Sequence, residues 1–241
     1  MAAVPQFSSE QPPSAIVAEA GGWLAAKWGN GARYLRQKRE VVRKVSGRAE
    51  GITLQTSSWS RAGQGTWVSP RIWVTDRQVD AWQRQHPAHH GMFSRGGSIF
   101  SSLIVNLGLP PDVELFGPLR HAQPATSISL SAFWAALEQE IFPNTKLLWG
   151  DPATAAELLP DRWLVFPEPL FWWAIAFEDG VAARTILSRY FRGKDRAREH
   201  FDVGRVLAAS GDAAPVPISN TMVAFGWSAV STGALTFDEL V

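Results

Sequence analysis

Three histidines that lie close together are the first residues in the sequence that could do chemistry. His86 and His89 could share one face of a helix at the i, i+3 spacing that suits a metal-binding pair, with His90 beside them. Pro87 stands between the first two, and the ten residues after His90 include no Asp, Glu or Cys. We therefore interpret this segment as a polar loop after a short helix, and we expect no metal site and no cofactor.

The serine- and glycine-rich motifs do not match an established catalytic or phosphate-binding pattern. The chain has no Gly-x-Ser-x-Gly sequence, which marks the nucleophile elbow of many hydrolases. The segment 95–98 lacks the Gly-Lys-Ser/Thr ending of a P-loop, and the segment 193–195 lacks both the upstream glycine and the final Ser or Thr. Because the chain has no cysteine, thiol nucleophiles and disulfides are excluded as well.

Paired carboxylates could supply general acid and base groups, provided that their environments separate the two pKa values. Glu138 and Glu140 are two residues apart and so lie on different faces of a predicted helix. We interpret both as solvated surface residues. An enzyme of unrecognised class stays an alternative, with His121 or His200 beside a carboxylate in a cleft between a sheet and helices.

Basic side chains dominate the segment 33–48, which carries Glu40 as its one acid. They are Arg33, Arg36, Lys38, Arg39, Arg43, Lys44 and Arg48. Such a segment could bind phosphate groups or an acidic protein, and Arg36, Arg39, Arg43 and Lys44 are its candidate binding residues. The alternative is an edge strand whose charges prevent aggregation. The net charge of +1 argues against a dedicated nucleic-acid binder.

Tryptophan is unusually frequent, with twelve residues against two tyrosines. Trp59, Trp67 and Trp73 fall on successive predicted strands and could form an exposed aromatic surface that anchors a partner. The alternative is that several of them pack inward against helices. Trp172 and Trp173 are adjacent, so we expect at most one to point into a helical core. We take Trp173 as a further candidate for contact with a partner.

The first half of the chain predicts one helix followed by strands. Ser14 is a candidate N-cap for a helix that the glycines of 29–31 end. Strand-forming residues recur between turn residues in three runs: 39–45, 51–59 and 66–75. Pro70 interrupts the third run and predicts an edge strand or a bulge. These runs predict an antiparallel meander, to which 100–107 adds a strand.

Helical patterns dominate the second half. Asp151 precedes a proline, a pair typical of a helix start, and Ser129 or Ser131 is a candidate cap for an earlier helix. Further helices are predicted at 170–177, 181–191 and 195–209, and strand-like pieces at 221–230. Residues 108–127 hold four prolines and few periodic signals, which indicates a connection.

The fold class that these patterns predict is α+β. We expect an antiparallel β-meander of about four strands with an N-terminal helix and a helical C-terminal half packed on it. The ranges are a mobile tail at 1–13, a β-rich half at 14–108, a connection at 109–127 and a helical half at 128–241. We expect these parts to form one compact domain.

Composition places the chain among globular proteins. Hydrophobic residues make up 46% and charged residues 19%, far from the composition of disordered chains. The N-terminal segment has neither the basic nor the apolar region of a secretory signal, and no stretch approaches the length of a membrane span. We therefore expect a soluble, cytoplasmic protein with no membrane partner.

Part of the chain resembles an uncharacterised bacterial family of domains of unknown function. The matching residues are Gly31, the basic run 36–45 and the segment 52–59 with its Gln-Thr-Ser sequence, followed later by the helical pair 171–191 with its small residues. The resemblance covers about a third of the chain. It implies the order helix, basic strand, Gln-x-Ser strand and C-terminal helices, and it implies no defined chemistry.

The functional expectation is a protein-interaction or regulatory protein, for instance an immunity-type partner in a bacterial conflict system. The missing catalytic motifs, the basic run and the tryptophan excess support it, so we expect another protein as partner and do not expect an enzyme. A nucleic-acid-associated protein that uses the segment 33–48 is the second alternative, beside the enzyme. An exposed flat apolar patch would favour a protein partner, a polar cleft an enzyme, and salt-sensitive binding a nucleic acid.

Overall fold

A computed structural model of the chain describes residues 3–57, 60–61, 65–86, 96–116, 127–213 and 221–236. It has the α+β fold that the sequence predicts, with an N-terminal helix, a mostly antiparallel sheet and a helical C-terminal half. The chain divides into two compact units, each built from two separate segments. The first unit comprises Met1–Val74 and Ser101–Trp149, and the second comprises Thr75–Phe100 and Gly150–Val241.

One seven-stranded sheet organises the first unit. Its strands are β1 (Arg33–Leu35), β2 (Glu40–Val45), β3 (Arg48–Thr56), β4 (Thr66–Asp76), β5 (Ser98–Leu103), β6 (Asp112–Phe116) and β7 (Ser127–Ser129). The order is β1-β2-β3-β4-β6-β7, and β5 also pairs with β4. The β1–β2, β2–β3 and β4–β6 pairs are antiparallel, whereas β6–β7 is parallel. The predicted meander is therefore present as β1–β4.

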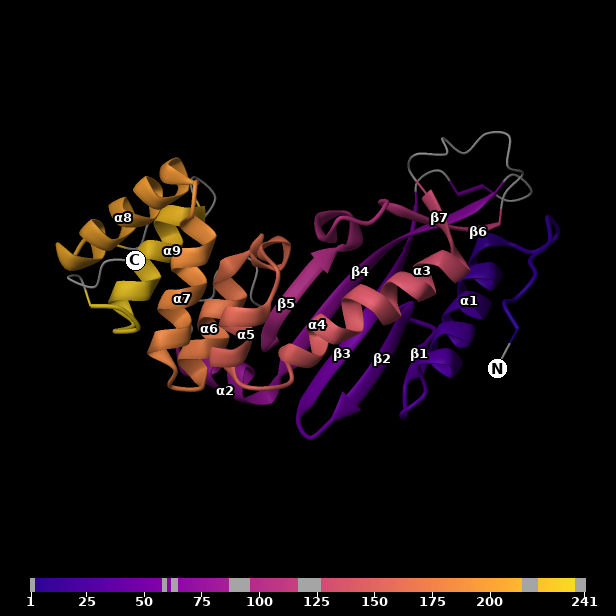
Figure 1. Cartoon of the computed structure of the whole chain (residues 1–241), viewed down its shortest axis with the longest axis horizontal. Helices are drawn as coiled ribbons and strands as arrows, with labels where there is room; N and C mark the ends of the chain where they lie inside the picture. Colours follow the sequence, from indigo (N-terminus) through magenta and orange to yellow (C-terminus); the bar gives the residue numbers. More distant parts are fainter. Residues whose placement is uncertain are drawn as a thin grey trace. The chain divides into compact units, whose positions relative to one another are not determined.

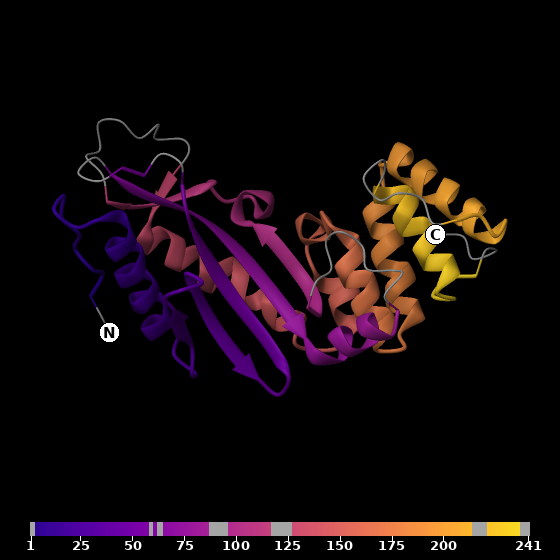
Figure 2. The ribbon, with the colours of Figure 1, turned by 180° about the vertical axis from the view of Figure 1, so that it is seen from behind.

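Helices cover one face of this sheet. They are α1 (Pro13–Trp28), α3 (Leu130–Ala136), the π-helical turn η3 (Leu137–Ile141) and α4 (Phe142–Leu147). Figure 1 shows α3 and α4 in front of β2–β4, and Figure 2 shows the same strands from behind, with none of these helices over them. Helix α1 packs against β1, β2 and β3, and Trp28 stacks on Phe142 with ring centroids 4.8 Å apart. This packing buries Val41, Ile52 and Ile72 on the covered face.

A glycine inside α1 lets strand β1 pack closely against the helix. A Cβ on Gly21 would lie 2.8 Å from Cζ of Tyr34, so only glycine lets the Tyr34 ring of β1 pack against this helix. The Gly21-Gly22 pair is a weak helix former by itself. Tertiary packing of the buried residues around it, such as Leu24, stabilises the helix instead.

Helices make up most of the described part of the second unit. They are α5 (Pro152–Leu158), α6 (Pro167–Ala176), α7 (Gly180–Phe191), α8 (Asp195–Ala209) and α9 (Thr221–Ser231), and α2 (Arg77–Gln85) packs on α6. Asp76, Asp151 and Asp179 cap α2, α5 and α7 by accepting backbone N–H hydrogen bonds. No helix in the described ranges is long and apolar enough to cross a membrane.

The structure differs from the predicted elements at several places. Ser14 lies inside α1, whose N-cap is Pro12. Strand β6 lies inside 109–127, where a connection was predicted, and the strand predicted at 100–107 ends at Leu103 before a 3-10 turn. Residues 221–231 form helix α9, although strand-like pieces were predicted there. A Cβ on Gly226 would lie 2.8 Å from the backbone carbon of Phe201, so close packing on α8 decides the conformation.

Candidate binding surface

The helix-free face of the first unit's sheet carries the residues that we consider as a site. Strand β4 alternates strictly, with buried residues on the helix-covered side and Trp67, Ser69, Arg71 and Trp73 half-buried on the other. The nearly extended strand separates the two tryptophans by about 20 Å, because each residue adds about 3.3 Å. We call this surface the open face.

The Trp73 side chain packs over strand β3 on the open face. Its indole Nε1 donates a hydrogen bond of 3.2 Å to the Thr53 hydroxyl on β3, while its Cε2 occupies the space above Gly51. A Cβ on Gly51 would fall 2.6 Å from that carbon. Gly51 and Thr53 are two residues apart on β3 and so share one face of the sheet, which places the Trp73 ring over this part of the strand. The ring stays partly exposed there.

Trp67 occupies a similar position at the other end of β4. Its six-membered ring lies over Gly65, where a Cβ would fall 3.0 Å from Cζ2 of the indole. The backbone N–H of Trp67 donates a hydrogen bond of 2.9 Å to the Ser60 hydroxyl. Both tryptophans thus lie over glycines, and the missing Cβ atoms let each ring approach the strand backbone.

The charged residues of the open face are unevenly distributed. Arg33 pairs in register with Val42, and Lys44 follows Val42 by two residues, so both cations project on the open face and both are exposed. Arg71 lies between the tryptophans and donates a 3.3 Å hydrogen bond to the Ser101 hydroxyl. At the Trp67 end, Glu114 of β6 stands directly opposite Trp67 in the register.

The remaining acids of this face have hydroxyl partners. Ser69 donates to the carboxylate of Asp112, and Thr53 donates to Glu40 at 3.4 Å. The turn between β1 and β2 adds the exposed Arg36 and Lys38 at the same edge of the sheet as Arg33. Cations therefore gather toward the β1–β2 edge, where Glu40 is also present, and the other two acids, Asp112 and Glu114, lie on β6.

The basic residues singled out from the sequence separate in the structure. Arg36 is exposed in the turn, and Lys44 lies on the open face. Arg39 has a left-handed backbone with φ of 54° and donates to the Thr56 hydroxyl at 2.7 Å. Arg43 points to the helix-covered face, as does Arg48, which donates to the Leu148 carbonyl at 3.2 Å.

Arg43 forms an ion pair with the buried Glu50. Its Nε donates to Glu50 at 2.7 Å, and its guanidinium carbon lies 5.6 Å from the ring centroid of Trp28 and 5.1 Å from that of Trp149. Glu50 is buried and stands directly opposite Arg43 in the β2–β3 register. The pair and the two rings hold the helices to the sheet, so Arg43 is not available to a ligand.

The tryptophans considered as binding residues also lie in different environments. Trp67 and Trp73 lie on the open face, whereas Trp59 falls outside the described residues. Trp172 and Trp173 are both fully buried in α6, although only one was expected to point into the core. Helix α6 is surrounded by α2, α5 and α7, which explains why both rings are covered. Trp173 therefore has no surface for a partner.

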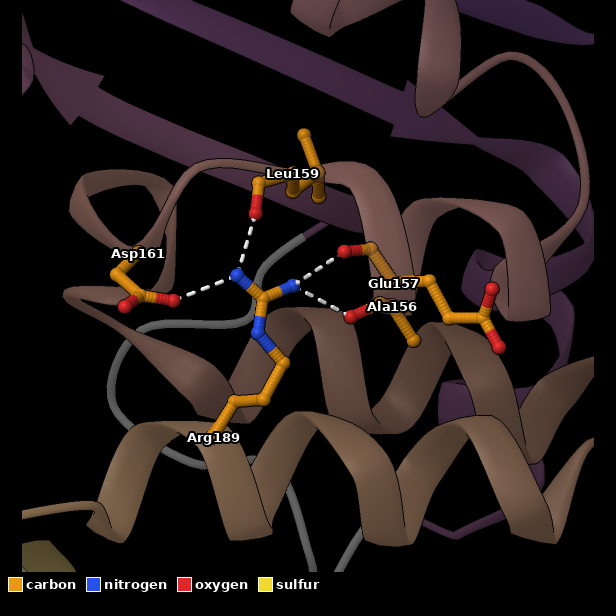
Figure 3. A network of polar contacts seen from close by, with 5 residues as sticks. All are labelled: Ala156, Glu157, Leu159, Asp161 and Arg189. Carbon is orange, nitrogen blue, oxygen red and sulfur yellow. Dashed lines mark hydrogen bonds and ion pairs between the residues drawn. The ribbon is translucent and has the colours of Figure 1, made fainter.

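A polar network in the second unit has a structural explanation (Figure 3). The Arg189 guanidinium donates to the carbonyls of Ala156 and Leu159 at 2.6 Å each, to that of Glu157 at 3.1 Å, and to the Asp161 carboxylate. These carbonyls lie at the end of α5, where helix geometry leaves them without backbone partners. Arg189 thus caps this helix, and its hydrogen bond and charge lower the pKa of Asp161.

The second unit also contains a buried acid within an aromatic stack. Burial raises the pKa of Glu168 to about 7, although the Trp172 indole donates to its carboxylate at 3.4 Å and lowers the pKa in part. Trp172 stacks on Trp82, and Trp82 stacks on His86. His86 was considered as a metal ligand together with His89 and His90, which lie outside the described residues.

A narrow crevice lies between α1, α4 and the sheet of the first unit. It is lined mainly by apolar side chains, and its carboxylate, Glu50, already pairs with Arg43. The crevice has no room for a ligand. In the part of the chain that the structure describes, no group of three His, Cys, Asp or Glu residues could hold a metal ion.

Comparisons with protein-family models, with curated proteins and with solved structures found no match for this chain. The resemblance to a bacterial family of domains of unknown function therefore stays a prediction.

Several residues of the open face were not found from the sequence. Gly51, Gly65, Thr53 and Glu114 matter because of what lies beside them on neighbouring strands, which the linear order does not indicate. The alternation of Trp67, Ser69, Arg71 and Trp73 was a usable signal, because residues two apart on a strand share one face.

Proposed function

We propose that this protein binds single-stranded nucleic acid on the open face of its first unit. The observation that carries the proposal is that Trp67 and Trp73 are both partly exposed on the open face, with their rings packed over Gly65 and Gly51. Nucleobases stack on such aromatic faces, and stacking accepts every base because each has a π-face. An open β-sheet with stacking aromatics is a recurrent design of proteins that bind single strands.

The cations of the open face support the same ligand. Arg33 and Lys44 lie on the Trp73 side, and Arg71 lies between the rings. A strand that stacks its bases on both tryptophans can direct its phosphates toward these three side chains. This local distribution matters more than the net charge of +1, because phosphates interact with the cations within a Debye length.

A protein partner, the first expectation from the sequence, receives less support from this geometry. Protein interfaces need an apolar core. Among the described residues of the first unit, the large apolar side chains that are most exposed are Val4, Val45 and Val105, and β2 directs Val45 to the face opposite Lys44. The two tryptophans are half-buried and stand among polar neighbours.

The test is a fluorescence-anisotropy titration with a labelled oligonucleotide of about 12 nucleotides, within the range of known single-strand site sizes. Replacing Trp73 or Trp67 by Ala removes one stacking platform, so we expect the dissociation constant to rise roughly 5- to 150-fold. Phe166→Ala, an exposed aromatic residue of the second unit, is the matched control and should leave affinity unchanged.

Salt dependence supplies an independent check. For single strands each phosphate contact contributes about −0.7 to the slope of log K against log salt, so three cations predict a slope of about −2. Lys44→Ala should reduce that slope by about 0.7, whereas Arg198→Ala on the exposed side of α8 should not change it. If the wild-type protein does not bind the oligonucleotide at low salt, or if both tryptophan variants bind as well as wild type, the proposal is wrong and a protein partner becomes the leading hypothesis.

A further inference from the structure

We infer that Glu114 makes the Trp67 position selective for bases that carry an exocyclic amino group. This inference rests on the proposed function and concerns one end of the same open face. It assigns a specificity residue to a surface whose stacking and phosphate contacts are otherwise indifferent to sequence.

The register places Glu114 where it can read a stacked base. Glu114 on β6 stands directly opposite Trp67 on β4, and both side chains are half-buried on the open face. Directly opposed residues of an antiparallel pair have Cβ atoms about 5 Å apart. A base that covers the Trp67 ring therefore has its edge within reach of the Glu114 carboxylate.

The chemistry of the carboxylate determines which base edge it accepts. An ionised Glu has only acceptor oxygens, so it pairs with N–H donors. Cytosine presents its N4 amino group and adenine its N6 amino group, and carboxylates accept hydrogen bonds from cytosine N4 in known complexes. Thymine and uracil present carbonyl oxygens at the corresponding position, which leaves two acceptors facing each other.

The neighbouring acid, Asp112, influences how the backbone of the bound nucleic acid runs. Asp112 lies two residues from Glu114 on the same face and accepts a hydrogen bond from Ser69. Two carboxylates at this end repel phosphates, whereas Arg71, Arg33 and Lys44 attract them toward the middle and the β1–β2 edge. The base edge, and not the phosphate, is therefore directed toward Glu114.

The experiment compares labelled oligo-dC and oligo-dT of equal length at pH 7.5 and moderate salt. We expect wild type to bind oligo-dC about tenfold more tightly, the discrimination typical of one good base contact. Glu114→Gln should abolish the preference, because an amide both donates and accepts. Glu138→Gln changes the net charge by the same amount at an exposed position of the helical layer, and it should leave the preference intact.

The outcomes separate the two proposals. Equal binding of oligo-dC and oligo-dT by wild type, or a preference for oligo-dT, overturns the role of Glu114 while still supporting nucleic-acid binding. A preference for oligo-dC that persists in Glu114→Gln also overturns it. Binding of neither oligonucleotide refutes the proposed function itself. If Glu114→Gln does not fold, a second measurement uses an oligo-dT strand with one central dC. The wild-type protein should bind this strand more tightly than oligo-dT.

Discussion

Replacing Glu168 by Gln should stabilise the protein above neutral pH. Glu168 lies in the first turn of α6 and is only 8% exposed, and its burial raises the pKa from 4.5 to about 7. Folding therefore favours the protonated acid. The stability that this provides is fully present below pH 4.5 and is lost as the pH rises through 7. Gln keeps the size of the side chain and the acceptor for the Trp172 indole but carries no charge.

The size of this stabilisation follows from the change in the pKa of Glu168. One pKa unit corresponds to about 1.4 kcal/mol, so ionisation of Glu168 costs the folded state about 3 kcal/mol at pH 8.5. The free energy of unfolding of Glu168→Gln should exceed that of wild type by this amount at pH 8.5. At pH 4.5, where the folded wild type is protonated, the two proteins should differ little.

The assay is urea unfolding followed by circular dichroism at both pH values. Glu199→Gln, at an exposed position on α8 in the same unit, controls for the loss of one negative charge and should show no such pH-dependent gain. If Glu168→Gln is no more stable than wild type at pH 8.5, or if its advantage is the same at pH 4.5, the reasoning about burial is refuted.

Two other substitutions test local features of the structure. Arg189→Met should lower the free energy of unfolding by about 3 kcal/mol, because it leaves several carbonyls at the end of α5 without their hydrogen-bond donor. Thermal melting measures this loss of stability. An unchanged melting temperature would contradict the capping role of Arg189. Gly51→Ala should displace the Trp73 ring from the sheet, since a Cβ would fall 2.6 Å from Cε2, and we expect weaker oligonucleotide binding together with about 1–3 kcal/mol of destabilisation from overpacking. Wild-type affinity in the folded Gly51→Ala protein would show that the ring position does not matter.

Local signals were sufficient to predict the meander and several helices. Turn residues around Gly47 and the alternation along β4 are properties of neighbouring residues, and Asp151 before a proline marks a helix start wherever it occurs. Strand β6 could not be found in this way, because its pairing with β4 is non-local and prolines surround it. The same holds for α9, whose conformation depends on close packing against α8.

The site was predictable only in part, and for the same reason. Trp67 and Trp73 were found because bulky aromatic residues on a strand are informative by themselves. Arg43 was grouped with the basic segment, but the register sets it opposite Glu50 on the covered face. Glu114 was missed because its significance comes from a partner on another strand. The odd or even position of a residue along a strand predicts the face of the sheet on which its side chain lies. The strand register determines which residues of the adjacent strands lie beside it, and the register depends on the whole sheet.

The most direct test of the central claim is photo-cross-linking of a 12-nucleotide single strand that carries 5-iodocytosine at each position in turn, followed by mass spectrometry of the linked peptides. Iodinated pyrimidines form cross-links with aromatic rings that they stack on. We expect cross-links at Trp67 and Trp73 in the first unit, with loss of each in the corresponding alanine variant. Cross-links confined to aromatic residues of the second unit would contradict stacking on the open face.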